Sequence, residues 1–105
     1  MIDTNEVKIT GKVMKILQIN DSLIRVTVSV HHEHYISGTR DIVESFVGVL
    51  VNNSTIIRKL SSLRKGDKVQ VTAHLKLDYQ FTSGGNRKEI LRVYADNIEI
   101  MDYRI

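Results

Sequence analysis

Three of the four histidines of the chain, with a glutamate and a tyrosine, lie in the stretch VSVHHEHYISG at residues 28–38. Imidazole and carboxylate groups at this density are typical of a zinc site. On an extended backbone, however, His32 and His34 face one side and the residues next to them face the other. Zinc needs at least three protein ligands, so a third would have to come from His74, far along the chain. The spacing therefore argues against a metal site, and we expect neither a metal nor a cofactor.

The same stretch has a second use that its residue types favour. Imidazole and phenol rings can stack on nucleic-acid bases, and their N–H and O–H groups can donate hydrogen bonds to phosphates. We interpret residues 31–44 as a flexible loop that closes on a nucleic-acid strand, with His34 and Tyr35 as contacting side chains. An exposed loop without a binding role stays open as the alternative.

No group of side chains in the sequence has the spacing of a known catalytic motif. The serines have no histidine and aspartate beside them in a triad-like arrangement. The glycine pair in SGGN, residues 83–86, joins two predicted strands, whereas a phosphate-binding loop opens a helix. Asp41 and Glu44 lie in a polar connection without neighbours that would tune them for acid–base chemistry. We therefore expect a binding protein rather than an enzyme; a metal-dependent hydrolase that uses the four histidines is the weakest alternative.

The composition is that of an ordinary globular domain, and a single domain covering residues 1–105 is the simplest expectation. There is no cysteine, which excludes disulfides and thiolate-bound metals and fits a reducing cytoplasm. The start MIDTNEVK lacks the basic and apolar regions of a signal peptide, and no apolar run reaches the ~18 residues of a membrane helix. The net charge of +3 is too small to identify a polyanionic partner by itself. We expect a cytoplasmic protein that does not contact a membrane.

Apolar residues recur at every second position over most of the chain, which predicts β-strands. In the first predicted strand the alternation changes phase after Gly11, which indicates a bulge. A second irregularity is expected at Ala95-Asp96-Asn97, inside the last strand. The predicted strands cover residues 7–17, 24–31, 46–51, 69–77 and 89–101.

One helix is predicted between the third and fourth strands. Ser54 is a suitable N-cap, apolar residues recur at Ile56, Leu60 and Leu63, and Gly66 is a suitable stop. Three strands, a helix and two strands are the order of the OB-fold, an all-β five-stranded Greek-key barrel closed at one end by its helix. The strands alone would leave an SH3-like barrel or a small sandwich open, and the position of the helix favours the OB-fold.

Three segments in order along the chain resemble bacterial and phage single-stranded DNA-binding proteins: NEVKITGKV (5–13), LRKGDKVQVTAHL (63–75) and YADNIEIM (94–101). The first resembles the opening strand of that family, the second its helix end and fourth strand, and the third its closing strand. The resemblance implies an OB-fold that binds single-stranded DNA without sequence specificity in replication, recombination or repair. It also implies a homo-oligomer, a dimer or a tetramer, that associates through barrel edges and notably through strand one.

The sequence departs from the family pattern in two respects. It has no tryptophan, although the family usually stacks bases on tryptophans; Phe46 falls where an aromatic residue enters strand three, but Asn52 falls where another commonly ends it. We also expect a domain that lacks the glycine-rich linker and the acidic C-terminal tail of the family. In the family these two segments imply recruitment of replication proteins. In this the chain resembles the tailless primosomal OB proteins. The alternative function is therefore an adaptor that bridges replication, primosome or helicase proteins with weak nucleic-acid affinity.

The residues expected to bind DNA are aromatic side chains for bases and basic side chains for phosphates. Phe46, in an apolar run, fits either the core or a stacking site, and the resemblance favours stacking. Tyr79 and Phe81 share one side of their strand and are expected to be exposed, whereas Tyr94 fits stacking and plain surface cover equally well. The full set is Phe46, Tyr79, Phe81, Tyr35, His34, Tyr94, Lys8, Lys12, Arg25, Lys76, Arg87, Lys88 and Arg92.

Overall fold

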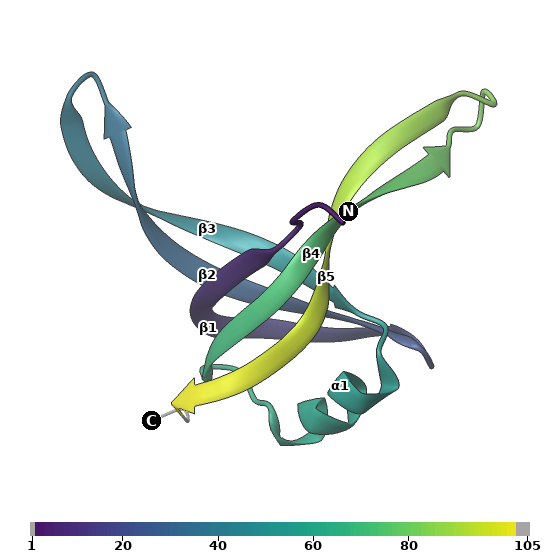
Figure 1. Ribbon diagram of the computed structural model, residues 1–105, viewed down its shortest axis with the longest axis horizontal. Helices are drawn as coiled ribbons and strands as arrows, with labels where there is room; N and C mark the ends of the chain where they lie inside the picture. Colours follow the sequence, from purple (N-terminus) through teal and green to yellow (C-terminus); the bar gives the residue numbers. More distant parts are fainter. Residues whose placement is uncertain (1, 103–105) are drawn as a thin grey trace.

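In the computed structural model, which describes residues 2–102, five long strands close into one barrel (Figure 1). The strands are β1 (Val7–Asn20), β2 (Leu23–Ile36), β3 (Thr39–Val51), β4 (Lys68–Phe81) and β5 (Arg87–Asp102), in the spatial order β1-β2-β3-β5-β4. A short helix, α1 (Ser54–Lys59), and a 3₁₀ turn, η1 (Leu60–Ser62), connect β3 to β4. The expected OB-fold, with its helix between strands three and four, is confirmed. No helix within residues 2–102 is long and apolar enough to cross a membrane.

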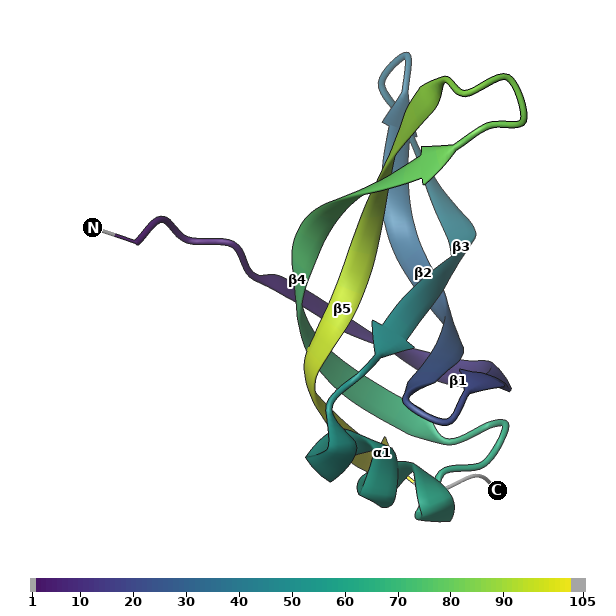
Figure 2. The same ribbon diagram turned by 90° about the vertical axis from the view of Figure 1, so that its right-hand side faces the viewer.

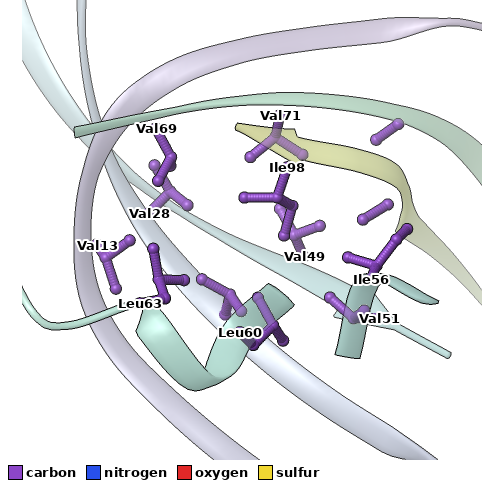
Figure 3. Packing of buried hydrophobic residues seen from close by; sticks show 13 residues of the cluster. Val13, Val28, Val49, Val51, Ile56, Leu60, Leu63, Val69, Val71 and Ile98 are labelled. Atoms are coloured by element: carbon purple, nitrogen blue, oxygen red, sulfur yellow. The ribbon is translucent and has the colours of Figure 1, made fainter. Parts of the chain in front are cut away.

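Alternate residues of the strands point into the barrel and pack as a small aliphatic core (Figure 3). Short branched side chains dominate because a barrel of five strands is narrow and because they fit a pleated surface well. The completely buried valines are Val13, Val26, Val28, Val49, Val51, Val69 and Val71. Ile56, Leu60 and Leu63, the apolar positions of the predicted helix, are buried against one end of this core, so α1 and η1 close that end.

β1 changes its partner halfway along its length. Its first half pairs with β4 and its second half pairs with β2. The β1–β2 register shifts between Val13 and Lys15, which is the bulge expected from the phase change. Gly11 lies where β1 changes from β4 to β2, and a Cβ there would overlap the carbonyl oxygen of Ser29. The close approach of β1 to β2 therefore requires glycine at this position.

Two smaller expectations have different outcomes. The irregularity expected in β5 is present, because the β4–β5 register leaves Asp96 as an extra residue on its strand. The expected N-cap is wrong by one residue. The side chain of Asn53, rather than that of Ser54, accepts hydrogen bonds of 2.9 and 3.4 Å from backbone N–H groups of the first helical turn.

The expectation of a flexible loop over residues 31–44 is wrong. β2 and β3 stay paired out to Ile36 and Thr39, and the turn between them is Ser37-Gly38, with φ of 50° and 80°. Positive φ at both central turn residues is the geometry of a tight hairpin, whose twist matches that of the flanking strands. The histidines therefore lie on a two-stranded ribbon, and Asp41 and Glu44 are strand residues.

Two hairpin arms extend beyond the barrel. One is formed by the distal parts of β2 and β3, and the other by the distal parts of β4 and β5, with its tip at residues 82–86. Both arms leave the barrel end opposite α1, and they diverge from each other (Figures 1 and 2). The radius of gyration is 15.7 Å, against about 13 Å for a compact domain of this length. The arms account for the difference.

Candidate functional site

A groove opens where β3 and β5 part at the base of the two arms. The strands run parallel and pair only at Val49 with Val93 and at Leu50 with Tyr94; beyond these pairs they diverge (Figure 1). The hollow between them has a volume of about 410 Å³. We call it the fork groove, and its lining residues are Arg25, Phe46, Val47, Gly48, Leu50, Leu91, Arg92 and Val93.

Phe46 presents its ring to the fork groove from the outer face of β3. Val47 and Val49 point to the barrel interior, so strand alternation turns Phe46 outward, where it is 60% exposed. The apolar run around Phe46 also allowed a buried position in the core, but Phe46 does not occupy one. Because Phe46, Arg25 and Arg92 line the same hollow, a base on the ring would have two cations within reach of its phosphates.

Gly48 leaves room for Arg25 on the floor of the fork groove. A Cβ at Gly48 would lie 3.3 Å from Cδ of Arg25, so the aliphatic part of Arg25 passes over the β3 backbone at this point. Arg25 is exposed and forms no ion pair within residues 2–102. Its charge is therefore available to a phosphate.

Asp78, beside the groove, binds two basic groups and a phenol. Its Oδ1 lies 3.4 Å from Nζ of Lys76, and its Oδ2 lies 3.3 Å from Nη1 of Arg92. The hydroxyl of Tyr94 donates a 2.6 Å hydrogen bond to Oδ2. This hydrogen bond lowers the pKa of Asp78 and raises the pKa of Tyr94, so the pair is a carboxylate and a phenol at neutral pH. Lys76 and Arg92 thus share their charges with Asp78.

Tyr94 lies on the outer face with Arg92, as strand parity predicts, but its ring already has neighbours. The ring of His74 is stacked on it with centroids 6.0 Å apart, and Nζ of Lys76 lies 5.5 Å from its centroid. These contacts favour surface cover over base stacking for Tyr94. Asp78 was not predicted as part of the site, and His74 was considered only as a possible zinc ligand; the available signal is that both share the strand face of Lys76.

The β4–β5 arm presents Tyr79 and Phe81 on one face, which continues the inner face of the barrel. They are 50% and 73% exposed, so the expected exposure and shared side are observed. The guanidinium carbon of Arg87 lies 4.3 Å from the ring centroid of Tyr79, a cation–π contact. Lys88 pairs with Gln80 on the opposite face, so the arm separates the two basic residues of its hairpin.

The β2–β3 arm separates His34 from Tyr35. Tyr35 lies on the outer face opposite Arg40, whereas His34 lies on the inner face opposite Asp41. The carboxylate of Glu33 accepts a 3.4 Å hydrogen bond from the hydroxyl of Tyr35 and lies 3.3 Å from Nη1 of Arg40. The two predicted contact residues therefore face different directions from one ribbon.

Two of the three histidines of this arm, His31 and His32, have partners outside any metal site. Nε2 of His31 lies 3.2 Å from Oε2 of Glu44, and Nε2 of His32 lies 2.8 Å from Oγ of Ser45. Within the part of the chain that the structure describes, no three His, Asp or Glu side chains gather into a group that could hold a metal ion.

The two lysines predicted on the first strand do not reach the fork groove. Lys8 and Lys12 are exposed on β1, which lies between β2 and β4, whereas the groove lies between β3 and β5 across the barrel. Nζ of Lys8 lies 3.6 Å from Oε1 of Glu6. The structure thus gathers Phe46, Arg25 and Arg92 at one site and leaves the other predicted residues on the arms, beside the groove and on β1.

No protein-family model matches the chain, and no curated protein matches it in sequence. Solved structures do match it over almost the whole length of both chains. A Plasmodium falciparum SSB solved in complex with single-stranded DNA has a TM-score of 0.75 at 18% identity, and covers 97% of this chain and 98% of its own.

Two further structures have the same fold. The mitochondrial single-stranded DNA-binding protein of S. cerevisiae has a TM-score of 0.65 at 16% identity, with 97% of this chain and 99% of its own covered. The small single-stranded DNA-binding protein of Streptomyces coelicolor has a TM-score of 0.60 at 17% identity, with 94% and 95% covered. The resemblance to single-stranded DNA-binding proteins is thus confirmed in the fold.

Proposed function

We propose that the protein binds single-stranded DNA without reading its sequence, with the fork groove as the central contact. The observation that carries the proposal is the exposed ring of Phe46 in one hollow with Arg25 and Arg92. The similarity in fold to proteins named for single-stranded DNA binding supports it. No catalytic step is part of this function.

Each group in the groove has a separate task. A base stacked on Phe46 contributes roughly 1–3 kcal/mol, and the contact tolerates any base because every base has a flat face. Arg25 binds a phosphate without giving up another ion pair, whereas Arg92 turns from Asp78 toward the strand and Lys76 keeps its contact with Asp78. Tyr79, Phe81 and Arg87 on one arm and His34 and Tyr35 on the other add contacts where the strand leaves the groove.

The oligomeric part of the proposal rests on the free edge of β1 in the described part of the chain. The first half of β1 pairs with β4 only, so within residues 2–102 its second edge has no strand partner. An open strand edge is suited to pairing with another chain, and we propose a dimer or tetramer joined there. Replication, recombination or repair is the proposed setting, with other replication or helicase proteins as further partners.

The function is tested by titrating labelled oligo-dT and a duplex of equal length at two salt concentrations, with and without a chelator. We expect binding to oligo-dT that salt weakens and the chelator leaves unchanged, and little binding to duplex. Phe46→Ala should weaken oligo-dT binding roughly 5- to 150-fold, the equivalent of one lost stacking contact, with an unchanged melting temperature. Ile42→Ala, an equally exposed position on the same face of β3, is the matched control. Equal affinities for Phe46→Ala and wild type would exclude the groove as the site.

A protein-binding adaptor is the second candidate, and one feature favours it. The inner face of the β4–β5 arm exposes Leu75, Leu77 and Leu91 beside its two aromatic residues. Exposed apolar strips of this kind are common at protein–protein contacts. Weak binding to both oligo-dT and duplex in the titration would favour the adaptor over the DNA-binding function.

A further inference from the structure

One row of paired residues runs across four strands from the fork groove to the far side of the barrel. Phe46 of β3 is paired with Ser29 of β2, Ser29 with Lys12 of β1, and Lys12 with Lys68 of β4. All four have outward strand parity, and three of them are exposed. Since neighbouring strands are about 4.8 Å apart, Lys12 lies only about 10 Å from Phe46 along this row.

The far end of the row is hollowed. A pocket of about 250 Å³ is lined there by Thr10, Gly11, Lys12, Ser29, His31 and Lys68. Lys12 and Lys68 face each other directly, and neither forms an ion pair within residues 2–102. Like charges in directly opposed strand positions destabilise a sheet unless an anion lies between them.

The carboxylates near the pocket do not supply that anion. Glu44 accepts a 2.6 Å hydrogen bond from Oγ of Ser29 and lies 3.2 Å from His31, so it is already bound on the β2 side. Asp102 is paired with Lys68 in the β4–β5 register but forms no salt bridge in the part of the chain described here. The pocket keeps two ammonium groups and a threonine hydroxyl for an external ligand.

We propose that this pocket binds a phosphate group, and that the group belongs to the same DNA strand that stacks on Phe46. The inference rests on the proposed function for the source of the phosphate, but not for the pocket chemistry. A strand that leaves the fork groove over β2 follows the row to Lys12 and Lys68. The barrel surface then holds the strand at two places, on Phe46 and at the pocket.

The pocket chemistry is tested with inorganic phosphate alone. At constant ionic strength, with chloride as the competing anion, phosphate should shift the amide NMR signals of residues 10–12, His31 and Lys68. The shifts should disappear in the double variant Lys12→Ala/Lys68→Ala. They should persist in Lys15→Ala/Lys65→Ala, which removes two exposed lysines that do not line the pocket. Absence of phosphate-specific shifts in the wild type would overturn the proposal.

The source of the phosphate is tested with two lengths of oligo-dT. A strand of about 8 nucleotides fits within the site of one OB-fold, and one of about 30 nucleotides extends well past it. The Lys12→Ala/Lys68→Ala variant should bind the long strand roughly 2- to 5-fold more weakly, with a salt slope smaller by about 0.7, as expected for one lost phosphate contact. Its affinity for the short strand, confined to the groove, should be unchanged, and sedimentation should give the same mass as the wild type.

The two proposals fail in different ways. Phosphate shifts with an unchanged long-strand affinity would support the pocket but assign it to a free phosphate or nucleotide, and would overturn the path along the row. If Phe46→Ala leaves oligo-dT binding unchanged while the phosphate shifts are still observed, the proposed function fails and the pocket chemistry stands. Weaker binding of the long strand by the lysine double variant, together with phosphate shifts in the wild type, supports both proposals.

Discussion

Asp78 is an acidic residue in a surface that is otherwise suited to bind phosphates. Its carboxylate contacts Lys76, Arg92 and Tyr94, and its side chain is 17% exposed. It therefore fixes the positions of two cations and also reduces the positive potential that they offer to DNA. We infer that Asp78 keeps the affinity of the groove moderate.

Asp78→Asn should consequently strengthen oligo-dT binding. The amide keeps the shape of the carboxylate and an oxygen that can accept the Tyr94 hydrogen bond, but it no longer neutralises Lys76 and Arg92. We expect a gain of roughly 2- to 5-fold at low salt that fades as salt is raised, because ion pairs at a protein surface are weak and are screened by salt. Anisotropy titrations at two salt concentrations check this. Weaker binding would show instead that ordering of Arg92 by the carboxylate is the dominant effect.

Gly11 is a residue whose role is set by the backbone alone. In Gly11→Ala the added methyl group would overlap the Ser29 carbonyl oxygen, which belongs to a paired strand and cannot move aside. Overpacking of this kind costs about 1–3 kcal/mol of unfolding free energy. Gly48→Ala is the control, because its nearest neighbour is the flexible stem of Arg25 at 3.3 Å. Urea unfolding should separate the two variants; equal stabilities would contradict the close approach of β1 to β2 at Gly11.

At the scale of elements, the strands of the barrel and the turn at the tip of the β4–β5 arm were predictable, whereas the β2–β3 arm was not. Val7 to Val13 and Val69 to Leu77 alternate apolar and polar residues because one face of each strand covers the core. Beyond the barrel there is no core to cover, so residues 31–44 lose this alternation although they stay paired. The Ser37-Gly38 turn was the available signal for a hairpin.

The arms give a prediction that belongs to this scale. Tyr79 and Phe81 lie beyond the barrel, so the double variant Tyr79→Ala/Phe81→Ala should leave the melting temperature nearly unchanged. It should weaken oligo-dT binding at least about 5-fold, the lower end for one lost base contact. Gln80→Ala removes an exposed side chain from the opposite face of the same arm and should have no effect. Unchanged affinity in the double variant, measured by anisotropy, would assign the arm to protein contacts instead.

At the scale of the whole molecule, the fork groove depends on a contact that the local pattern does not contain. Phe46 and Arg92 come together because β3 and β5 pair in parallel for a short distance and then diverge. Such pairing joins segments far apart in sequence, and hydrophobic alternation fixes which side chains face outward but not which strands are neighbours. For this reason the aromatic and basic residue types were predictable, whereas their grouping, and the place of Lys12 on the row to the pocket, were not.

The salt dependence of binding measures how many of these cations act together. The net charge of +3 gives little general attraction, so the slope should reflect local phosphate contacts. For a strand of about 8 nucleotides held by Arg25 and Arg92, the logarithm of the affinity should fall with the logarithm of salt concentration with a slope of about −1.4, from about 0.7 per phosphate. Asp78→Asn should steepen this slope as Lys76 becomes available. A slope near zero for the wild type would contradict phosphate contacts in the groove, because stacking on Phe46 alone releases no counterions.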